Sequence, residues 1–166
     1  DNALSPRLLH HLIDHPPNAP WYGFTRITPA LADADFCRSL KKAGCVMLKL
    51  GVESGDDSVL HGMNKGHTVA LASSVLHQLH SAGIAAFVYL LFSTPWENES
   101  SAQATLEFVV RHQHEITFIN PAIFNQPIEP GQPAQPFYGG DLALYTDYEH
   151  PAAWSRGQVR RFQIGR

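Results

Sequence analysis

Apolar residues recur at helical spacing near the start of the chain. Residues three and four positions apart share one face of an α-helix, so this stripe predicts an amphipathic helix. Ser5 suits the N-cap, and Pro6 suits the first turn, where its missing N–H costs nothing. The helix is expected to end before Pro16, and a short strand should follow. The stripe consists of Leu4, Leu8, Leu9, Leu12 and Ile13.

Downstream, helical patterns alternate with nearly continuous apolar runs of strand length. Helices are expected to begin at Asp33, at Thr68 and at Ser100 or Ser101, and Gly44 and Gly83 should end the first two of these. Apolar runs between helices are typical of parallel strands covered on both faces. The pattern predicts an α/β fold: a partial (β/α) barrel with about four parallel strands and outer helices. The strands are expected near 22–27, 45–52, 84–92 and 116–124.

The character of the chain changes after Asn125. Proline, glycine and glutamine dominate 127–140, which indicates a loop with little regular structure. We therefore expect residues 1–130 to form the barrel part and residues 131–166 an irregular C-terminal tail, with room for one short helix. Four strands form only an open half of a barrel, which has an unpaired edge and an exposed apolar inner face. We expect these surfaces to favour a homodimer.

Composition and charge narrow the class of protein. The chain has 166 residues, 44% hydrophobic and 16% charged, with a formal net charge of −3. It carries no basic stripe of the kind that binds nucleic acid, and no signal peptide is evident. Its longest apolar run, 84–92, is too short to span a bilayer. Cys37 and Cys45 are interpreted as reduced thiols, and a cytoplasmic location is expected.

In parallel α/β folds, ligands bind at the carboxyl ends of the strands. Arg26, Glu53, Ser93 and Asn125 stand at or just after four predicted strand ends. A carboxylate such as that of Glu53 is costly at this position unless it has a partner or a ligand. The alternative is a structural ion pair between Glu53 and Arg26 or Lys65. We also expect the helix after Glu53 to present free N–H groups to an anion.

Several histidines are spaced so that two rings could share one face of a helix. A zinc site needs further protein ligands that no cluster in the sequence supplies. We therefore predict solvent-exposed side chains and assign no metal ligand. The pairs are His11 with His15, His77 with His80, and His112 with His114.

Five sequence segments together resemble the second half of the radical S-adenosylmethionine domain, especially the branch that often carries an upstream cobalamin-binding domain. The similarity covers about residues 1 to 130. The segments are Thr25-Arg26-Ile27, Leu40-Lys-Lys-Ala-Gly-Cys45, Gly51-Val-Glu-Ser-Gly55, Val59-Leu-His-Gly-Met-Asn-Lys65-Gly66 and Ala82-Gly83-Ile84, with a looser match at Phe92-Ser-Thr-Pro-Trp-Glu97.

The resemblance implies cofactor contacts at four positions. Arg26 matches a residue that meets the ribose or carboxylate of S-adenosylmethionine, and Glu53 matches a side chain beside the bound cofactor. Lys65 matches a basic residue that can pair with the methionine carboxylate. We expect Glu53 and Lys65 to lie at the mouth of the half-barrel and to face the same cavity as Arg26. Tyr89 matches a contact with the ribose or adenine edge, although a tyrosine in an apolar strand is more often part of the core.

The resemblance also implies a reaction that this chain cannot support alone. Relatives hold a [4Fe–4S] cluster through a CxxxCxxC motif and cleave S-adenosylmethionine to a 5′-deoxyadenosyl radical. That motif is absent here, so the chain is expected to be an inactive piece of a longer radical enzyme. The parent would bind S-adenosylmethionine, the cluster, a small-molecule substrate and, through an upstream domain, cobalamin. The alternative is a non-catalytic binding or assembly module that never held a cluster.

Overall fold

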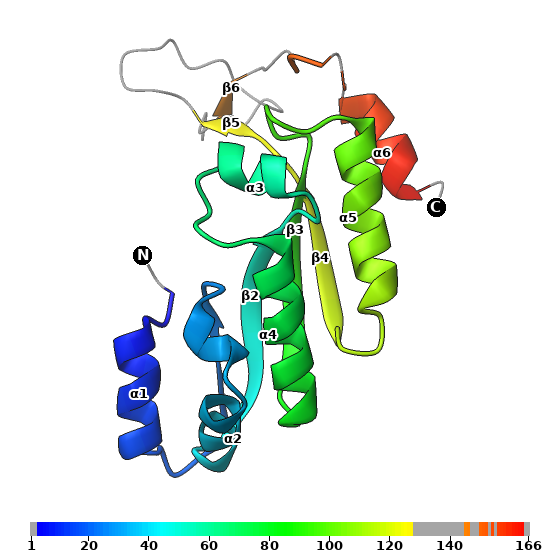
Figure 1. Cartoon of the computed structure of the whole chain (residues 1–166). Helices are drawn as coiled ribbons and strands as arrows, with labels where there is room; N and C mark the ends of the chain where they lie inside the picture. Colours follow the sequence, from blue (N-terminus) through cyan, green and yellow to red (C-terminus); the bar gives the residue numbers. More distant parts are fainter. Residues whose placement is uncertain (1–2, 128–144, 147–149, 153, 155, 165–166) are drawn as a thin grey trace.

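The core of the molecule is a sheet of four parallel strands, in the spatial order β1-β2-β3-β4 (Figure 1). The computed structural model describes residues 3–127, 145–146, 150–152, 154 and 156–164. The predicted α/β fold with four parallel strands is confirmed. The strands are β1 (Trp21–Thr25), β2 (Cys45–Glu53), β3 (Ala85–Phe92) and β4 (Phe118–Ile123).

Two strand boundaries differ from the prediction. β1 ends at Thr25, whose backbone bridges to Leu4, so Arg26 and Ile27 lie beyond the strand. β4 begins at Phe118 rather than at Ile116, because the backbone N–H of Ile116 donates to the carbonyl of His112 in the turn that ends the preceding helix. Apolar residues in a turn can extend a strand pattern beyond the ladder that the backbone forms.

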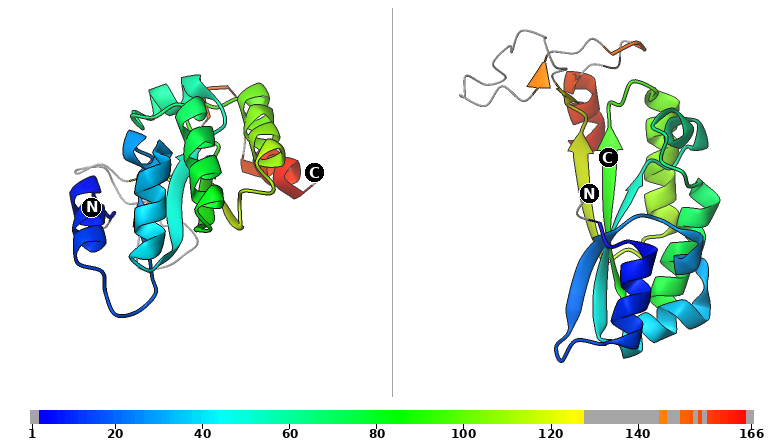
Figure 2. Two further views of the ribbon diagram at one scale, coloured as in Figure 1. Left: turned by 60° about the horizontal axis from the view of Figure 1, so that its bottom comes forward. Right: turned by 90° about the vertical axis from the view of Figure 1, so that its left-hand side faces the viewer.

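Helices cover one side of the sheet, as the edge-on view in Figure 2 shows for α2, α4 and α5. Two shorter helical segments follow the carboxyl ends of β1 and β2 and lead into the helices that pack on the sheet. The helices are α1 (Pro6–Asp14), α2 (Ala34–Lys42), α3 (Asp57–Gly62), α4 (Val69–Ser81), α5 (Glu99–Arg111) and α6 (Arg156–Ile164), with a 3₁₀ turn η1 (Pro29–Ala32).

Side-chain caps start the helices largely as the sequence predicts. Ser5, Asp33 and Thr68 each accept a hydrogen bond from a backbone N–H of the first turn of α1, α2 and α4. Helix α5 begins at Glu99, one or two residues before the start expected at Ser100 or Ser101. Its cap is Asn98, which accepts from the N–H of Ser101 while the Ser101 hydroxyl accepts from the N–H of Asn98.

Burial alternates along the central strands, which corrects the expectation of strands covered on both faces. Along β3, every second side chain from Ala86 to Phe92 is buried against the helices, while Phe87 and Tyr89 point to the opposite face and are only partly buried. The outer strands expose more of this second face, at Phe24 and Phe118. Within the described residues, helices therefore cover one face of β2 and β3 and leave the other face open, whereas β4 is exposed along most of its length, at Ile119 as well as at Phe118.

The described part of the C-terminal segment packs on the same core as the strands. Trp154, Val159 and Phe162 are buried, and the ring of Phe162 lies 6.4 Å from that of Phe92 at the end of β3. Two short antiparallel strands, β5 (Gln126–Pro127) and β6 (Tyr145–Thr146), were not predicted. The proposed boundary at residue 130 and most of the predicted loop lie outside the described residues, so the division into two regions stays a prediction.

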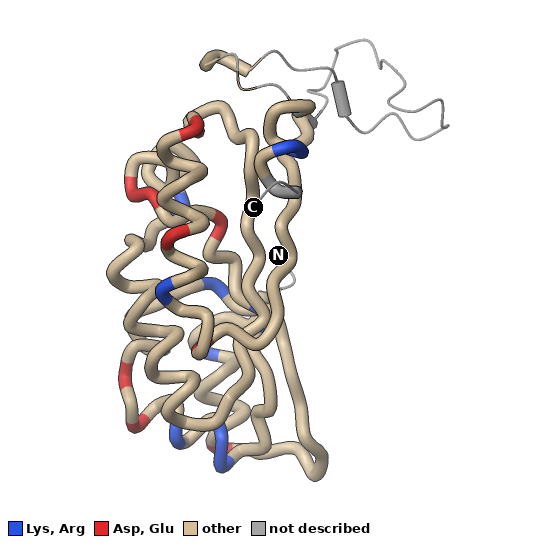
Figure 3. The backbone as a smooth tube through the Cα atoms, turned by 90° about the vertical axis from the view of Figure 1, so that its right-hand side faces the viewer, with Lys and Arg blue, Asp and Glu red and all other residues tan. Residues whose placement is uncertain are grey.

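Charged residues of both signs are interspersed along the chain (Figure 3). The described residues form no segment in which one sign alone collects over several turns. None of the described helices is both long enough and apolar enough to cross a bilayer. The expected absence of a nucleic-acid partner and the cytoplasmic location stay predictions.

A buried carboxyl group lies where the C-terminal segment meets β3. Glu97 is only 1% exposed, and its Oε2 accepts a hydrogen bond from the backbone N–H of Ser93. Burial raises the pKa of Glu97 from 4.5 to about 7, although the Ser93 N–H and the nearby Trp154 indole favour the charged form. Neither Oε1 of Glu97 nor Nε1 of Trp154 makes a hydrogen bond of ordinary geometry within the described residues.

We predict that Glu97 makes the chain less stable as the pH rises. A carboxyl whose pKa is higher in the folded state stabilises the fold fully below pH 4.5 and loses that contribution as the pH rises to about 7. The difference between the two pKa values corresponds to about 3 kcal/mol in the free energy of unfolding. Urea unfolding between pH 4 and pH 8 should therefore show Glu97→Gln gaining stability relative to wild type as the pH rises. Glu107→Gln, at an exposed position on α5, serves as the control, and parallel curves for Glu97→Gln and wild type would contradict the prediction.

Candidate functional site

The carboxyl end of β2 ends in a strained turn centred on Glu53. Its φ is +68°, a left-handed value that residues other than glycine seldom adopt. The N–H of Ser54 donates to the carbonyl of Val52 at 2.9 Å, which closes a three-residue γ-turn around Glu53. The ladder between β2 and β3 also shifts register between Gly51 and Glu53. Strain of this kind collects at functional sites, where surrounding contacts hold it in place.

Helix α5 supplies the contacts that hold this turn. The hydroxyl of Ser54, which is fully buried, lies 3.1 Å from Oγ1 of Thr105, and the N–H of Gly55 donates to the same Oγ1 at 2.9 Å. A Cβ atom on Gly55 would lie 2.7 Å from the carbonyl oxygen of Ala104 and 2.8 Å from Cβ of Phe108. Glycine at this position is therefore what lets the strand end approach the helix so closely.

The residue that faces Glu53 comes from the loop between α3 and α4. Nζ of Lys65 donates to Oε1 of Glu53 at 2.9 Å. Both side chains are partly shielded, with 31% of Lys65 and 15% of Glu53 exposed. Gly51 gives the carboxylate room, because a Cβ there would lie 2.8 Å from Oε1. Of the alternative pairings considered from the sequence, the structure contains the one between Glu53 and Lys65.

A cavity of about 320 Å³ opens beside this ion pair. The prediction that Arg26, Glu53 and Lys65 face the same cavity is confirmed, although their contact with a cofactor stays a prediction. The wall combines charged groups with apolar ones, and a second cavity of about 450 Å³ shares Asn64, Lys65 and His67 with the first. The lining residues of the first cavity are Phe24, Arg26, Ile27, Gly51, Glu53, Met63, Asn64, Lys65 and His67.

His67 is a site residue that sequence reasoning missed. Its Nε2 lies 3.3 Å from the carbonyl of Val52, and burial lowers its pKa, although hydrogen bonds to backbone carbonyls oppose that shift. The ring is therefore neutral near pH 7 and adds hydrogen-bonding capacity to the cavity without adding charge. The sequence offered one signal for His67, its position two residues after Lys65. The structure shows that the loop carrying both residues lines the cavity.

Two further predictions from the sequence concern Tyr89 and the start of α3, and the structure places neither feature at the cavity as expected. Tyr89 does not line the cavity; its ring packs on the open face of the sheet, 5.5 Å from that of Phe24 and 5.0 Å from that of Phe87. The expectation of free N–H groups at the start of α3 is wrong. The side chain of Asp56 accepts from the N–H of Ser58 at 2.8 Å and of Val59 at 3.1 Å, so the protein's own carboxylate occupies those donors. The assignment of Tyr89 to a cofactor stays a prediction.

The two cysteines do not fit an iron–sulfur cluster. Cys37 and Cys45 are buried, and burial raises their pKa values to about 11 and about 12, so both are neutral thiols. Cys45 begins β2 and so lies at the end of that strand opposite Glu53. Cluster iron is bound by thiolates, usually three or four of them at one place. Among the described residues, no group of three His, Cys, Asp or Glu is arranged to hold a metal ion.

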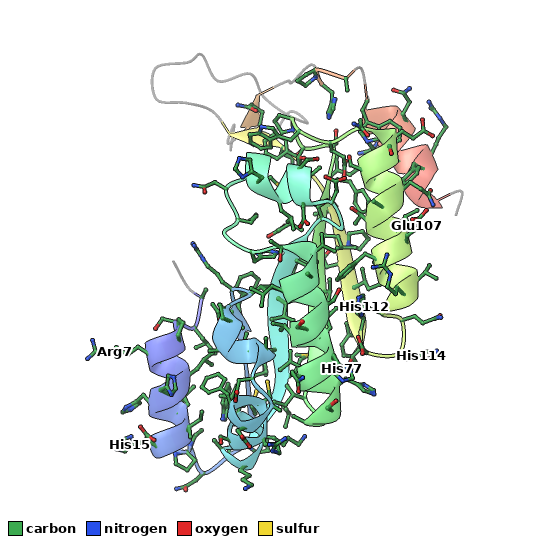
Figure 4. The ribbon with its side chains drawn as sticks, viewed as in Figure 1. Arg7, His15, His77, Glu107, His112 and His114 are labelled. Atoms are coloured by element: carbon green, nitrogen blue, oxygen red, sulfur yellow. The ribbon has the colours of Figure 1, made fainter. Side chains whose placement is uncertain are left out.

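The histidines of the helices are mostly exposed, as predicted, with one exception. Figure 4 labels His77 on α4 and His112 at the end of α5. His112 is buried: its Nδ1 lies 2.6 Å from Oε2 of Glu115, and its Nε2 lies 2.9 Å from the hydroxyl of Ser73. His77 reaches the other oxygen of Glu115 at 3.1 Å. These contacts join α4 to the turn after α5.

Four parallel strands with helices outside and a cavity lined by charged groups at the strand ends define a partial (β/α) barrel. The family model of the radical SAM superfamily matches residues 5–109, which is more than half of the sequence. The chain therefore belongs to the radical SAM superfamily.

Individual relatives support the same fold. A curated relative, bacteriochlorophyllide d C-12(1)-methyltransferase of Chlorobaculum tepidum, is 32% identical over 75 residues, which are 45% of this chain and 16% of that protein. The radical S-adenosylmethionine methyltransferase TsrM of Kitasatospora setae, solved with cobalamin and a [4Fe–4S] cluster, matches with a TM-score of 0.56 and 19% identity over 70% of this chain. The cobalamin-dependent radical enzyme OxsB matches with a TM-score of 0.52 and 16% identity over 61% of this chain. The chain spans 24% of the TsrM chain and 16% of OxsB.

We predict that Gly55→Ala destabilises the chain by about 1–3 kcal/mol, because the added methyl group collides with the backbone of α5. Chemical denaturation would measure the loss. Gly66→Asn is the matched control: Gly66 has a φ of +75°, a side chain there would meet no atom within 4 Å of its Cβ, and asparagine tolerates this conformation. An equal loss for both variants would show that general loop perturbation, rather than the contact with α5, is responsible.

Proposed function

We propose that this chain supplies the later βα units of the barrel of a radical S-adenosylmethionine enzyme, and that its cavity binds the amino-acid end of S-adenosylmethionine. The observation that carries the proposal is the cavity at the end of β2, where Glu53, Lys65 and Arg26 meet. Membership of the superfamily supports it, because the match spans all three residues.

The charges of the cavity suit a zwitterion. The methionine part of the cofactor carries a carboxylate and an ammonium group. Lys65 or Arg26 would bind the carboxylate through charge-assisted hydrogen bonds, and Glu53 would accept from the ammonium or from a ribose hydroxyl. Because Glu53 and Lys65 already neutralise each other, a zwitterion that pairs with both of them adds no net charge to the cavity.

The iron–sulfur cluster would belong to another part of the intact protein. When bound, the cluster and S-adenosylmethionine together supply a 5′-deoxyadenosyl radical; the cysteines of this chain do not contribute to holding them. TsrM was solved with a cluster and cobalamin, which supports both cofactors in the parent protein. A small-molecule substrate and a cytoplasmic location belong to the same proposal. A non-catalytic binding module is the alternative.

We expect Glu53→Gln and Lys65→Met in the intact protein to weaken the binding of S-adenosylmethionine by about tenfold or more, because each variant removes a charged hydrogen-bonding group. Isothermal titration calorimetry would measure the affinity. Lys42→Met, at an exposed position in the last turn of α2, is the control.

The same variants separate this role from a purely structural ion pair. Both variants should lower the thermal stability, because the two side chains are mostly shielded and the remaining charge loses its partner. A role in cofactor binding predicts a loss of affinity in addition. Variants that lose stability but bind the cofactor as wild type does would contradict the proposal and leave a structural ion pair in its place.

A second expectation concerns the chain alone. Anaerobic reconstitution of the 166-residue chain with iron and sulfide should give no [4Fe–4S] absorbance in the visible range and no cleavage of S-adenosylmethionine, because its two cysteines are buried and protonated. Cys37→Ala and Cys45→Ala provide the comparison. A stable cluster signal that either substitution abolishes would refute the assignment of the cluster to another part of the protein.

A further inference from the structure

Four side chains form a row across the open face of the sheet. In the strand registers, Phe24 lies opposite Lys49, Lys49 opposite Phe87, and Phe87 opposite Phe118. Residues opposite each other on neighbouring strands project from the same face. The rings of Phe87 and Phe118 lie 5.7 Å apart, and 53% of Phe118 is exposed. The row is thus an aromatic surface with one cation within it.

Lys49 has aromatic rings as neighbours but no acidic partner. Its Nζ lies 4.9 Å from the ring centroid of Tyr22 and 5.8 Å from that of Phe87. No aspartate or glutamate in the described part of the chain forms an ion pair with it. Cation–π contacts stabilise an ammonium group only modestly, whereas covering it without an anion is costly. A molecule that covers this face and carries a negative charge would therefore bind more favourably than a neutral molecule of the same shape.

The row is continuous with the candidate cofactor cavity. Phe24 belongs to both: it lines the cavity and its ring packs on that of Tyr89. Gly51, the next residue of β2 on the face of Lys49, also lines the cavity and has no side chain to separate the two regions. A ligand that lies on the row would thus be next to a molecule bound at Glu53 and Lys65.

We propose that the row of Phe24, Lys49, Phe87 and Phe118, together with Tyr22, binds a planar aromatic acid. The rings offer stacking surfaces, and the ammonium group of Lys49 pairs with the carboxylate of the ligand. That such a ligand is a substrate rests on the proposed function above, because the row then lies beside the bound cofactor. The binding itself depends only on the side chains of this surface.

The test is a titration of the 166-residue chain with 2-naphthoate and, in parallel, with neutral 2-naphthylmethanol. Calorimetry should show the acid binding about tenfold or more tightly than the alcohol. Lys49→Met should remove that preference, and Lys49→Arg should retain it. Phe118→Ala should weaken the binding of both molecules, because it removes a stacking surface and leaves the charge. Lys42→Met is the matched control for the loss of one positive charge.

Three results would overturn the proposal: equal affinities for the acid and the alcohol, a preference that survives Lys49→Met, or no binding of either probe. Sedimentation that reveals self-association sensitive to Lys49→Met, without binding of 2-naphthoate, would assign this face to a second copy of the chain instead. A failure of this proposal can be distinguished from a failure of the proposed function, because Lys49→Met should leave the binding of S-adenosylmethionine to the intact protein unchanged.

Discussion

The close approach of Gly55 to helix α5 determines where the second strand ends and, through that, where the cavity lies. Because no side chain separates the Gly55 backbone from the carbonyl of Ala104, the strand end and the helix are in direct contact. The hydroxyls of Ser54 and Thr105 satisfy the polar groups that this contact buries. With its following residues held in this way, Glu53 is confined to a turn with positive φ, and its carboxylate is directed toward the loop that carries Lys65.

The electrostatics of the site follow from that confinement. A carboxylate at the mouth of a parallel barrel would pay a desolvation cost, and the ion pair with Lys65 offsets part of it. The neutral ring of His67 adds no further charge, so the pair is locally balanced even though Arg26 lines the same cavity. A zwitterion would pair with both Glu53 and Lys65 with little net change in charge, whereas a simple anion or cation would pair with one of them and leave the other without a partner.

The sequence predicted correctly those features that depend only on neighbouring residues. The caps at Ser5, Asp33 and Thr68 and the stops at Gly44 and Gly83 are local, and the structure contains them. Arg26 and Glu53 were expected at one place because the ends of parallel strands meet at one edge of a sheet, whereas Lys65 was added by the resemblance to the radical S-adenosylmethionine domain. His112 was assigned to the surface in error, because its burial depends on Ser73 and Glu115, and no periodicity within one helix reveals a neighbouring helix.

The open face of the sheet was the hardest feature to interpret from sequence. An apolar run with one lysine resembles a strand covered on both faces, and the helical side of the sheet satisfies that pattern by itself. Only the registers show that Lys49 lies level with three phenylalanines from the other strands. An all-apolar row would be satisfied by any apolar cover, including the rest of a barrel. A lysine in that row favours a cover that also carries an anion, because burying an ammonium group without a partner is costly.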